Sequence, residues 1–185
     1  MIEDLLDDAK RRMDKSVEAT AHEFTTVRTG RASAALLDRV KVDYYGTETP
    51  LNQLSTINVP EPRMLTIQPY DPGSIKSIER AIQESELWLT PSNDGKLIRL
   101  PIPQLTEERR KELVKVVRHL AEEGRVAVRN VRRDCMHHLK ELVRDGDVGD
   151  DEERRAEERA QKLTDEHVTK IDELLKRKEE EIMEV

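Results

Sequence analysis

Residues 106–144 read TEERRKELVKVVRHLAEEGRVAVRNVRRDCMHHLKELVR, and this uninterrupted stretch decides the fold. It contains no proline, and its apolar residues recur at spacings of three, four and seven, which is typical of an amphipathic helix. Thr106 suits the helix start, because its hydroxyl can cap the first turn and the two glutamates that follow favour the helix dipole. At 1.5 Å rise per residue the helix would be roughly 58 Å long. A helix of this length needs partners that bury its apolar stripe.

Two further helices are predicted on either side of this stretch. Residues 2–28 carry apolar side chains at helical spacing and are interrupted only near Gly30: Leu5, Ala9, Met13, Val17, Phe24 and Val27. After a break at residues 145–149, a third helix has a similar seam: Ala156, Ala160, Leu163, Ile171, Leu174 and Ile182. None of the three can bury its seam alone, so residues 1–30 and 104–185 are predicted to form an elongated three-helix bundle.

Residues 31–103 have a different character, because all eight prolines of the chain lie between Pro50 and Pro103. Short β-type runs at 40–45, 55–59, 64–67 and 96–100 alternate with turn residues. Asp71 and Pro72 suit a helix start, and the helix that follows has an apolar face made of Ile75, Ile78, Ala81 and Ile82. We therefore predict an α+β protein in which a small α/β domain is inserted into the bundle.

Two short connections join the predicted domain to the bundle. They fall at Thr29, Gly30 and Arg31 and at Pro101, Ile102 and Pro103. Two adjacent connections without a broad interface allow domains to swing, so we predict that these residues form a hinge.

The composition indicates a cytoplasmic protein. Cys135 is the single cysteine, so an intrachain disulfide is excluded. No apolar run approaches the length of a membrane span, and the acidic residues directly after Met1 are unlike a signal or transit peptide. Charged residues make up 38% of the chain and aromatic residues only 3%, which fits long helices with narrow seams and a large wet surface.

The net charge of −7 is unevenly distributed. Residues 109–144 hold 11 basic and 5 acidic side chains, a net +6, whereas residues 145–185 hold 8 and 16, a net −8. A strongly basic segment inside an acidic protein favours a polyanionic partner more than the total charge suggests.

On a helical wheel the basic residues of the second long helix form one stripe beside its seam. The stripe contains Lys111, Arg118, Arg125, Arg129 and Arg132, and Arg133 extends it around the outer face. Arginine suits bidentate contacts to phosphate and stacking on bases, so we predict that these six residues bind RNA. The alternative is a solvated face whose arginines pair with the acidic third helix, and the absence of acids at i+4 between Arg125 and Arg133 argues against it.

Other candidate chemistry is weak. The five histidines do not have metal-ligand spacing, and the sequence contains no phosphate-binding glycine loop, nucleophile elbow or CxxC motif. Cys135 and His138 face the predicted seam, so we expect both to be buried. Tyr44 and Tyr45 could stack on bases, but strand alternation predicts that one of the pair is in the core. We predict a protein that is not an enzyme and that holds no cofactor or metal.

Several motifs together resemble the ribosome recycling factor family. They are RTGRAS at 28–33, YYGT at 44–47, PLNQL at 50–54, LTEERRK at 105–111, RVAVRNVRRD at 125–134 and QKLTD at 161–165. The resemblance runs from Met13 nearly to the C-terminus, and chance or shared coiled-coil bias would not reproduce the motifs of the central domain.

This resemblance implies an L-shaped, hinged molecule that binds the large (50S) ribosomal subunit after termination. The helical arm would lie on 23S ribosomal RNA, with Arg125, Arg129, Arg132 and Arg133 in contact. Elongation factor G with GTP would then split the subunits and release messenger and transfer RNA, and we expect the protein to act as a monomer without a membrane. The alternatives are a helical protein-protein adaptor without RNA binding and a hydrolase that uses surface carboxylates.

Overall fold

The computed structural model describes residues 1–184. Its contacts divide the chain into two compact units, Met1–Thr29 with Thr106–Val185 and Gly30–Leu105. The first unit is wholly helical and the second holds all the strands.

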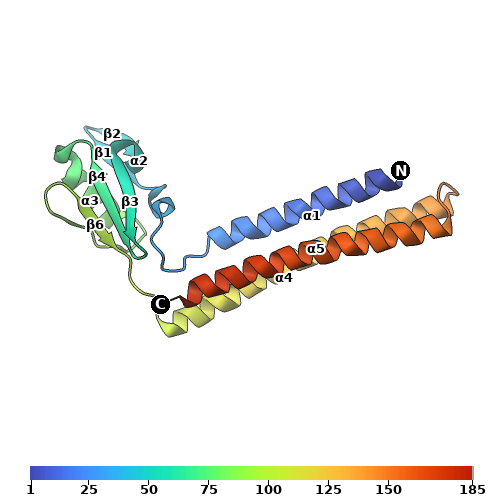
Figure 1. The fold of residues 1–185 in the computed structure, drawn as a ribbon. Coiled ribbons are helices and arrows are strands. Elements are labelled where there is room, and N and C mark those ends of the chain that lie inside the picture. The colour runs from blue at the N-terminus through green and yellow to red at the C-terminus, as the bar shows by residue number, and fades with distance from the viewer. Residues whose placement is uncertain (185) are drawn as a thin grey trace. The chain divides into compact units, whose positions relative to one another are not determined.

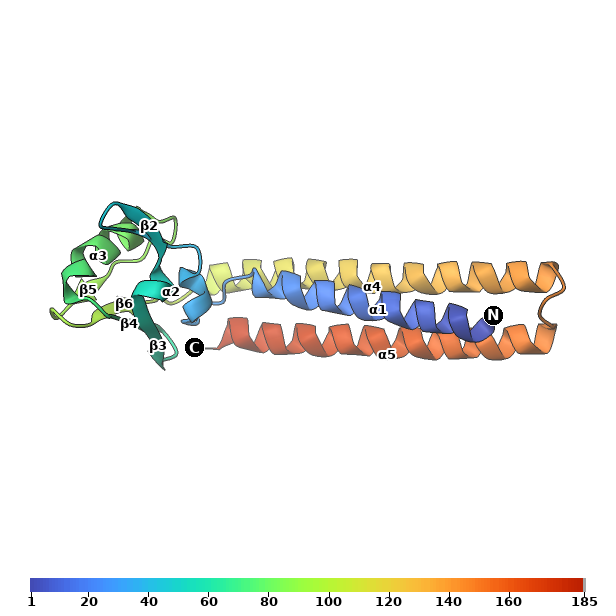
Figure 2. The same ribbon diagram turned by 90° about the horizontal axis from the view of Figure 1, so that it is seen from above.

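The helical unit is a three-helix bundle of α1 (Ile2–Thr25), α4 (Glu107–Arg144) and α5 (Asp150–Met183). The three helices lie side by side along their length, and a short turn joins α4 to α5 (Figures 1 and 2). Thr106 caps α4 as predicted, because its Oγ1 accepts a hydrogen bond from the Arg109 backbone N at 3.1 Å. Four acids occupy the first turn of α5, where they favour the helix dipole.

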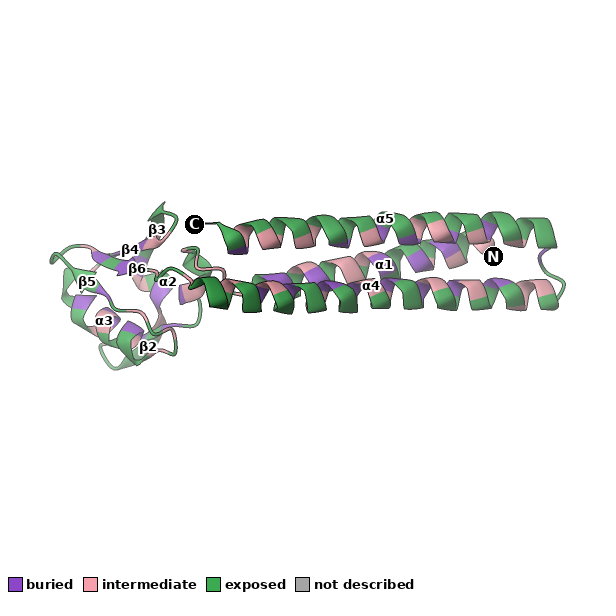
Figure 3. Ribbon diagram, turned by 90° about the horizontal axis from the view of Figure 1, so that it is seen from below, coloured by how far each residue is buried: buried purple, intermediate pink, exposed green. Residues whose placement is uncertain are grey.

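Buried faces of the three helices point toward one another (Figure 3). The core of the bundle contains Leu6, Ala9, Met13 and Phe24 from α1, Leu113, Val117, Ala121, Val128, Val131, Cys135 and Leu139 from α4, and Ala156, Ala160, Ile171 and Ile182 from α5. The predicted burial of Cys135 is therefore confirmed. The seams are used inside the bundle, which removes the basis of the adaptor alternative.

The predicted seam of α4 was displaced around the helix. On a wheel at 100° per residue, the buried residues centre about 40° from the predicted direction. The prediction that His138 is buried was wrong, because its side chain is 53% exposed and its Nδ1 lies 3.4 Å from Glu141 Oε2. The buried arc is as wide as the predicted stripe, but its direction is set by the two helices, α1 and α5, on which α4 packs.

The first helix ends three residues earlier than predicted. The hydroxyls of Thr25 and Thr26 donate to the carbonyls of His22 and Glu23, at 2.6 and 2.7 Å. The Thr26 and Val27 backbone N–H groups bond three residues back, which tightens the last turn and ends the helix.

The second unit contains a four-stranded antiparallel sheet in the order β3-β4-β6-β5 and a separate β1-β2 hairpin. The strands are β1 (Lys41–Tyr44), β2 (Thr47–Pro50), β3 (Ser55–Glu61), β4 (Met64–Pro69), β5 (Ser92–Asn93) and β6 (Ile98–Pro101). Its helices are η1 (Ala34–Leu37), α2 (Leu51–Leu54), η2 (Pro72–Ser74) and α3 (Ile75–Glu84). The predicted strands correspond to β1, β3, β4 and β6, whereas β2 and the two-residue strand β5 were missed.

The prediction that Tyr44 or Tyr45 belongs to the core was wrong. Tyr45 is 82% exposed and Tyr44 is half-buried. The core contributions of this part of the chain come from Val40 and Val42.

Branched apolar side chains from the sheet, the hairpin and α3 fill the core of this unit. Its members are Leu37, Val40, Val42, Leu51, Leu65, Ile67, Ile75, Ile78, Ile82, Ile98 and Leu100. Asp71 is the predicted cap, since its Oδ1 accepts from the Gly73 backbone N at 2.9 Å. Within residues 1–184, no helix combines the length and the apolar character needed to cross a membrane.

Candidate nucleic-acid interface

Three arginines of the predicted stripe face α5. Arg118, Arg125 and Arg132 are spaced by seven residues, so they occupy one side of α4. Arg118 Nε donates to Glu179 Oε1 at 2.6 Å, and Arg125 Nε donates to Asp172 Oδ1 at 2.8 Å. Arg132 donates to Gln161 Oε1 at 3.0 Å. These three side chains therefore link α4 to α5. For these three residues, the structure agrees with the alternative interpretation of the stripe, in which its arginines pair with the third helix.

Arg125 is the most enclosed of the three, with a side chain that is 19% exposed. Burial acts to lower its pKa, but the hydrogen bonds with Asp172 and Glu122 outweigh that effect and raise the pKa. The Glu122 partner lies three residues before Arg125, a spacing that the search for acids at i+4 did not cover. Arg125 therefore remains a cation that is engaged within the bundle.

The remaining members of the stripe point outward. Arg129 is 44% exposed, and its nearest acid is Glu122 at 3.5 Å. Arg133 is exposed and has no hydrogen bond or ion pair within residues 1–184. Lys111 is exposed near the start of α4 and pairs with Glu107 at 3.3 Å. Arg129 and Arg133, one helical turn apart, thus differ from Arg118, Arg125 and Arg132 in having no hydrogen-bond partner on α5 within residues 1–184.

The outward row of α4 continues beyond the predicted stripe. Lys140 and Arg144 follow Arg133 at spacings of seven and four, so they lie on the same outer side of the helix. Asp134, the one acid beside Arg133, is held by Arg12 of α1 at 2.9 Å, which neutralises it. The spacing of Lys140 and Arg144 was visible in the sequence. They were not predicted because the stripe was defined relative to the predicted seam, whose direction differs from that of the buried face. We call Arg129, Arg133, Lys140 and Arg144 the outer basic row.

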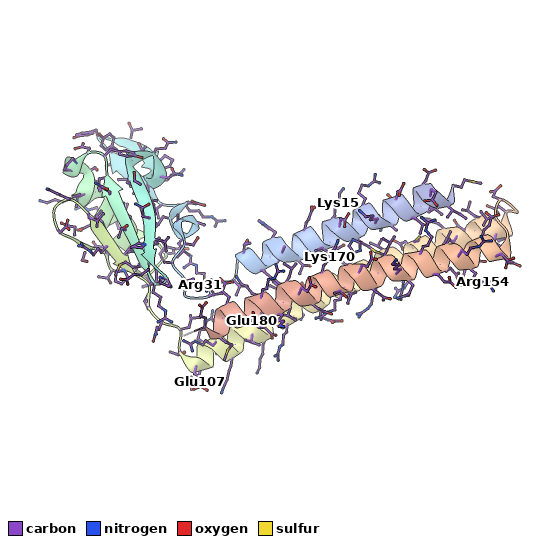
Figure 4. The ribbon with its side chains drawn as sticks, in the orientation of Figure 1. Lys15, Arg31, Glu107, Arg154, Lys170 and Glu180 are labelled. Carbon is purple, nitrogen blue, oxygen red and sulfur yellow. The ribbon has the colours of Figure 1, made fainter. Side chains whose placement is uncertain are left out.

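Charged side chains of both signs occur along the bundle. Figure 4 shows Glu107 of α4 and Glu180 of α5 at one end of the bundle and Arg154 of α5 at the other. Acidic residues of α5 that lie beside α4, such as Glu179 and Asp172, already have arginine partners. The negative charge of α5 is thus partly compensated on this side, while the outer basic row keeps its charge.

The predicted hinge residues are divided between the two units. Thr29 belongs to the helical unit, where its Oγ1 donates to Glu181 Oε1 at 2.8 Å. Pro101 ends β6, and the Ile102 backbone N donates to the Arg63 carbonyl at 2.8 Å, so both belong to the second unit. Gly30 has a φ of +79°, a conformation that favours glycine. Arg31 and Pro103 are exposed at the same two connections.

Residues 1–184 contain no group of three or more histidine, cysteine, aspartate or glutamate side chains placed to hold a metal ion. Exposed cations that recur along one side of a helix are suited to contacts with phosphates, although Arg129 lies 3.5 Å from Glu122 and Arg144 lies 3.9 Å from Asp145.

A profile of the family described as "Ribosome recycling factor" matches residues 20–183. The chain belongs to the ribosome recycling factor family. It is 60% identical over 180 residues to the ribosome-recycling factor of Rubrobacter xylanophilus, with 97% of each chain covered. It is 58% identical to that of Bacillus subtilis over 185 residues, with all of each chain covered.

Solved structures of ribosome recycling factors have the same fold. A solution structure of a ribosome recycling factor matches with a TM-score of 0.73 and 46% identity, covering 100% of this chain and 98% of the other. The Thermus thermophilus factor, described with Escherichia coli elongation factor G bound to the E. coli post-termination complex, matches with a TM-score of 0.63 and 47% identity over 99% of both chains. The predicted family and α+β fold are thereby confirmed.

Proposed function

We propose that this chain binds the large ribosomal subunit of post-termination complexes. With elongation factor G and GTP, it then splits the subunits and releases messenger and transfer RNA. Family membership supports the proposal, and so does the T. thermophilus relative, which is described together with elongation factor G on a post-termination complex. In this proposal the protein performs no chemical step, because the partner hydrolyses GTP.

The observation that carries RNA binding is the outer basic row of α4. Its guanidinium and ammonium groups are exposed, and Arg133 has no protein partner within residues 1–184. Cations spaced along a rigid helix can contact successive phosphates of folded ribosomal RNA and recognise its shape more than its sequence. Arg118, Arg125 and Arg132 would support this row by fixing α4 against α5, and Arg132 can also reach RNA with the nitrogen atoms that Gln161 does not engage.

The decisive experiment removes charge from the outer basic row. Arg129→Ala with Arg133→Ala should weaken binding to purified 50S subunits by roughly tenfold or more, because two charge-assisted contacts are lost. The slope of log affinity against log salt should fall by about two, since each phosphate contact contributes about one. Sedimentation with 50S subunits across a salt series measures both quantities.

The matched control is Arg155→Ala with Arg177→Ala, which removes the same charge from exposed positions of α5. It should leave the affinity and the salt slope close to those of the wild type. Unchanged far-UV circular dichroism would establish that both double variants remain folded. Equal pelleting of the Arg129/Arg133 variant and the wild type at every salt concentration would refute RNA binding through this row.

We also infer that the connections around Gly30 and Pro103 act as a hinge during splitting. The division of the chain into two compact units at these positions supports this inference. Inserting a Gly-Ser pair after Gly30 and another after Pro103 should preserve 50S binding, because the outer basic row is untouched. Subunit splitting with elongation factor G and GTP should slow, because force applied to one unit is transmitted less well to the other. An unchanged splitting rate, followed by light scattering, would remove the hinge from the mechanism.

A further inference from the structure

His137 lies among the members of the outer basic row of α4. It follows Arg133 by four residues and precedes Lys140 by three, which are the spacings that keep side chains on one side of a helix. On a wheel at 100° per residue, His137 and the four cations of the row fall within an arc of about 80°, centred roughly 160° from the middle of the buried face. The side chain of His137 is 68% exposed. An imidazole is therefore surrounded by cations on the side of the helix that faces solvent.

The ring of His137 has one side engaged and one side free. Its Nε2 lies 3.0 Å from Glu141 Oε1, one helical turn further along α4. The other oxygen of that carboxylate, Oε2, lies 3.4 Å from His138 Nδ1. The hydrogen bond with His138 lowers the pKa of Glu141, so this group is ionised at neutral pH. Within residues 1–184, His137 Nδ1 has no hydrogen-bond partner, so it is the nitrogen available to a ligand.

The charged groups of the neighbouring helices do not engage this ring. At this level of the bundle they are Asp8, Arg11 and Arg12 of α1 and Glu153 and Glu157 of α5. Arg12 pairs with Asp134 of α4, and Arg11 pairs with Asp8. Glu153 is close enough to Lys140 for the lysine charge to act on it. Among the described residues, Glu141 is thus the one acid in direct contact with His137.

A second histidine of α4 shows what is particular to this position. His119 lies five helical turns before His137 on the same outer side, and its Nε2 lies 3.0 Å from Glu123 Oε1. It is similarly exposed. Three residues after His119, however, comes Glu122, where His137 has Lys140. The same histidine–glutamate pair is therefore set among acids at one position and among cations at the other.

We propose that His137 is a further RNA-contacting residue of α4, and that it binds a phosphate of ribosomal RNA in its protonated form. A neutral ring with its proton on Nε2, toward Glu141, presents the lone pair of Nδ1 to solvent, and this lone pair repels a phosphate oxygen. A proton taken up from solvent by Nδ1 creates an N–H donor and adds one positive charge beside the row. The phosphate then accepts from Nδ1 while Glu141 holds the Nε2 side of the ring. This role of His137 rests on the proposed function, since it requires that the outer basic row meets RNA.

Binding would then take up a proton, so the affinity for RNA should rise as pH falls. An imidazole ordinarily titrates near pH 6.5, and a bound phosphate favours its charged form. Between pH 7.8 and pH 5.8 the affinity for 50S subunits should increase about threefold to tenfold, because one charge-assisted contact is gained. The slope of log affinity against log salt should become steeper by about one over the same interval.

Sedimentation with purified 50S subunits at pH 5.8, 6.8 and 7.8, each across a salt series, measures both quantities. Because the subunits and other histidines also respond to pH, each variant is compared with the wild type at the same pH. His137→Gln should bind almost as the wild type does at pH 7.8 and should lack the increase at pH 5.8. His137→Arg, a permanent cation, should show at pH 7.8 the affinity and salt slope that the wild type reaches at pH 5.8.

The matched control is His119→Gln, which removes an equally exposed histidine with an equally placed glutamate. It should keep the pH profile of the wild type. A constant affinity of the wild type across this pH range, an increase fully retained by His137→Gln, or an equal loss of the increase in His119→Gln would overturn the role of His137. Weak binding by Arg129→Ala with Arg133→Ala in the same series would then leave the proposed function intact. Absence of wild-type binding at every pH would overturn both.

Discussion

His167 is the one buried histidine among the described residues, with a relative exposure of 1%. Its Nδ1 lies 2.6 Å from the Leu163 carbonyl and its Nε2 lies 2.6 Å from Asp14 Oδ1. The Leu163 carbonyl and the Asp14 carboxylate therefore lie against the two ring nitrogens of this buried side chain. A polar ring inside the bundle is tolerated because both of its nitrogens have hydrogen-bond partners.

The Asp14 side chain makes bundle stability depend on pH. The hydrogen bond from His167 lowers the pKa of Asp14, burial opposes this, and Lys10 adds to the lowering. A lowered carboxyl pKa contributes stability that is present above the unfolded value of about 3.9 and is lost as pH falls through the folded value. Asp14→Asn should therefore cost roughly 1 kcal/mol at pH 7, allowing for the partial exposure of Asp14.

Urea unfolding of the wild type and of Asp14→Asn at pH 7, 5 and 3 measures this difference. The gap between their free energies of unfolding should be constant from pH 7 to 5 and should narrow toward pH 3. Asp4→Asn, an exposed change near the same end of the chain, serves as the control and should leave the wild-type profile unchanged. A gap that does not narrow at low pH would contradict the assigned ion pair.

The histidines also mark how far single residues could be predicted. His138 was expected in the core and His167 was given no role, but the structure reverses them. From the sequence alone, only the direction of the buried face on a helical wheel can be predicted. An error of about 40° in that direction moves a side chain from the seam to the surface. His167 lies in the α5 seam, three residues after Thr164 and four before Ile171. A polar side chain in a seam cannot be recognised as buried from sequence until its partner on another helix is known.

At the scale of elements, the bundle depends on a close approach of its helices at Gly124. A Cβ built on Gly124 of α4 would overlap Thr20 Oγ1 of α1 and would lie 3.2 Å from Ile171 Cδ1 of α5. Glycine in the middle of a helix is unfavourable by about 1 kcal/mol relative to alanine, so its presence here reflects packing and not helix propensity.

Gly124→Ala is therefore expected to destabilise the protein by about 1–2 kcal/mol, because the clash exceeds the gain in helix propensity. Thr20→Ala removes the obstructing hydroxyl, so the double variant should recover most of that loss. The coupling energy from the four free energies of unfolding should be about 1 kcal/mol or more. Ala121→Gly provides a matched comparison, since it should destabilise without any coupling to Thr20. Additive effects of Gly124→Ala and Thr20→Ala would contradict the close approach.

Elements with strong local signals could be predicted from sequence, and those defined by tertiary contacts could not. Thr106 and Asp71 carry capping side chains next to periodic apolar runs, and both helix starts were found. The strand β2 was missed because Thr47–Pro50 has polar residues and a proline, and it exists by pairing with β1 in the register Lys41 to Pro50. The prediction of the candidate interface had the same limit. Periodicity identified a basic helix face, while the partners of Arg118, Arg125 and Arg132 belong to α5.

At the scale of the whole molecule, each unit has a core of its own. The bundle encloses Met13, Val117, Ala160 and other apolar residues, and the second unit encloses an independent cluster around Ile67 and Ile78. The outer basic row and its supporting ion pairs lie entirely within the bundle. The proposed RNA contact is thus assigned to the bundle alone.

This separation predicts that the bundle binds without the second unit. Replacing residues 30–105 by a flexible Gly-Ser linker of about 12 residues, which can span roughly 40 Å, should give a folded three-helix protein. It should bind 50S subunits with the salt slope of the full chain and compete with it, because both present the same arginines. It should fail to split subunits with elongation factor G and GTP, because the second unit would be missing. Adding Arg129→Ala and Arg133→Ala to the bundle should weaken binding as in the full chain. Loss of 50S binding by a bundle that remains folded by circular dichroism would mean that the second unit carries part of the RNA contact.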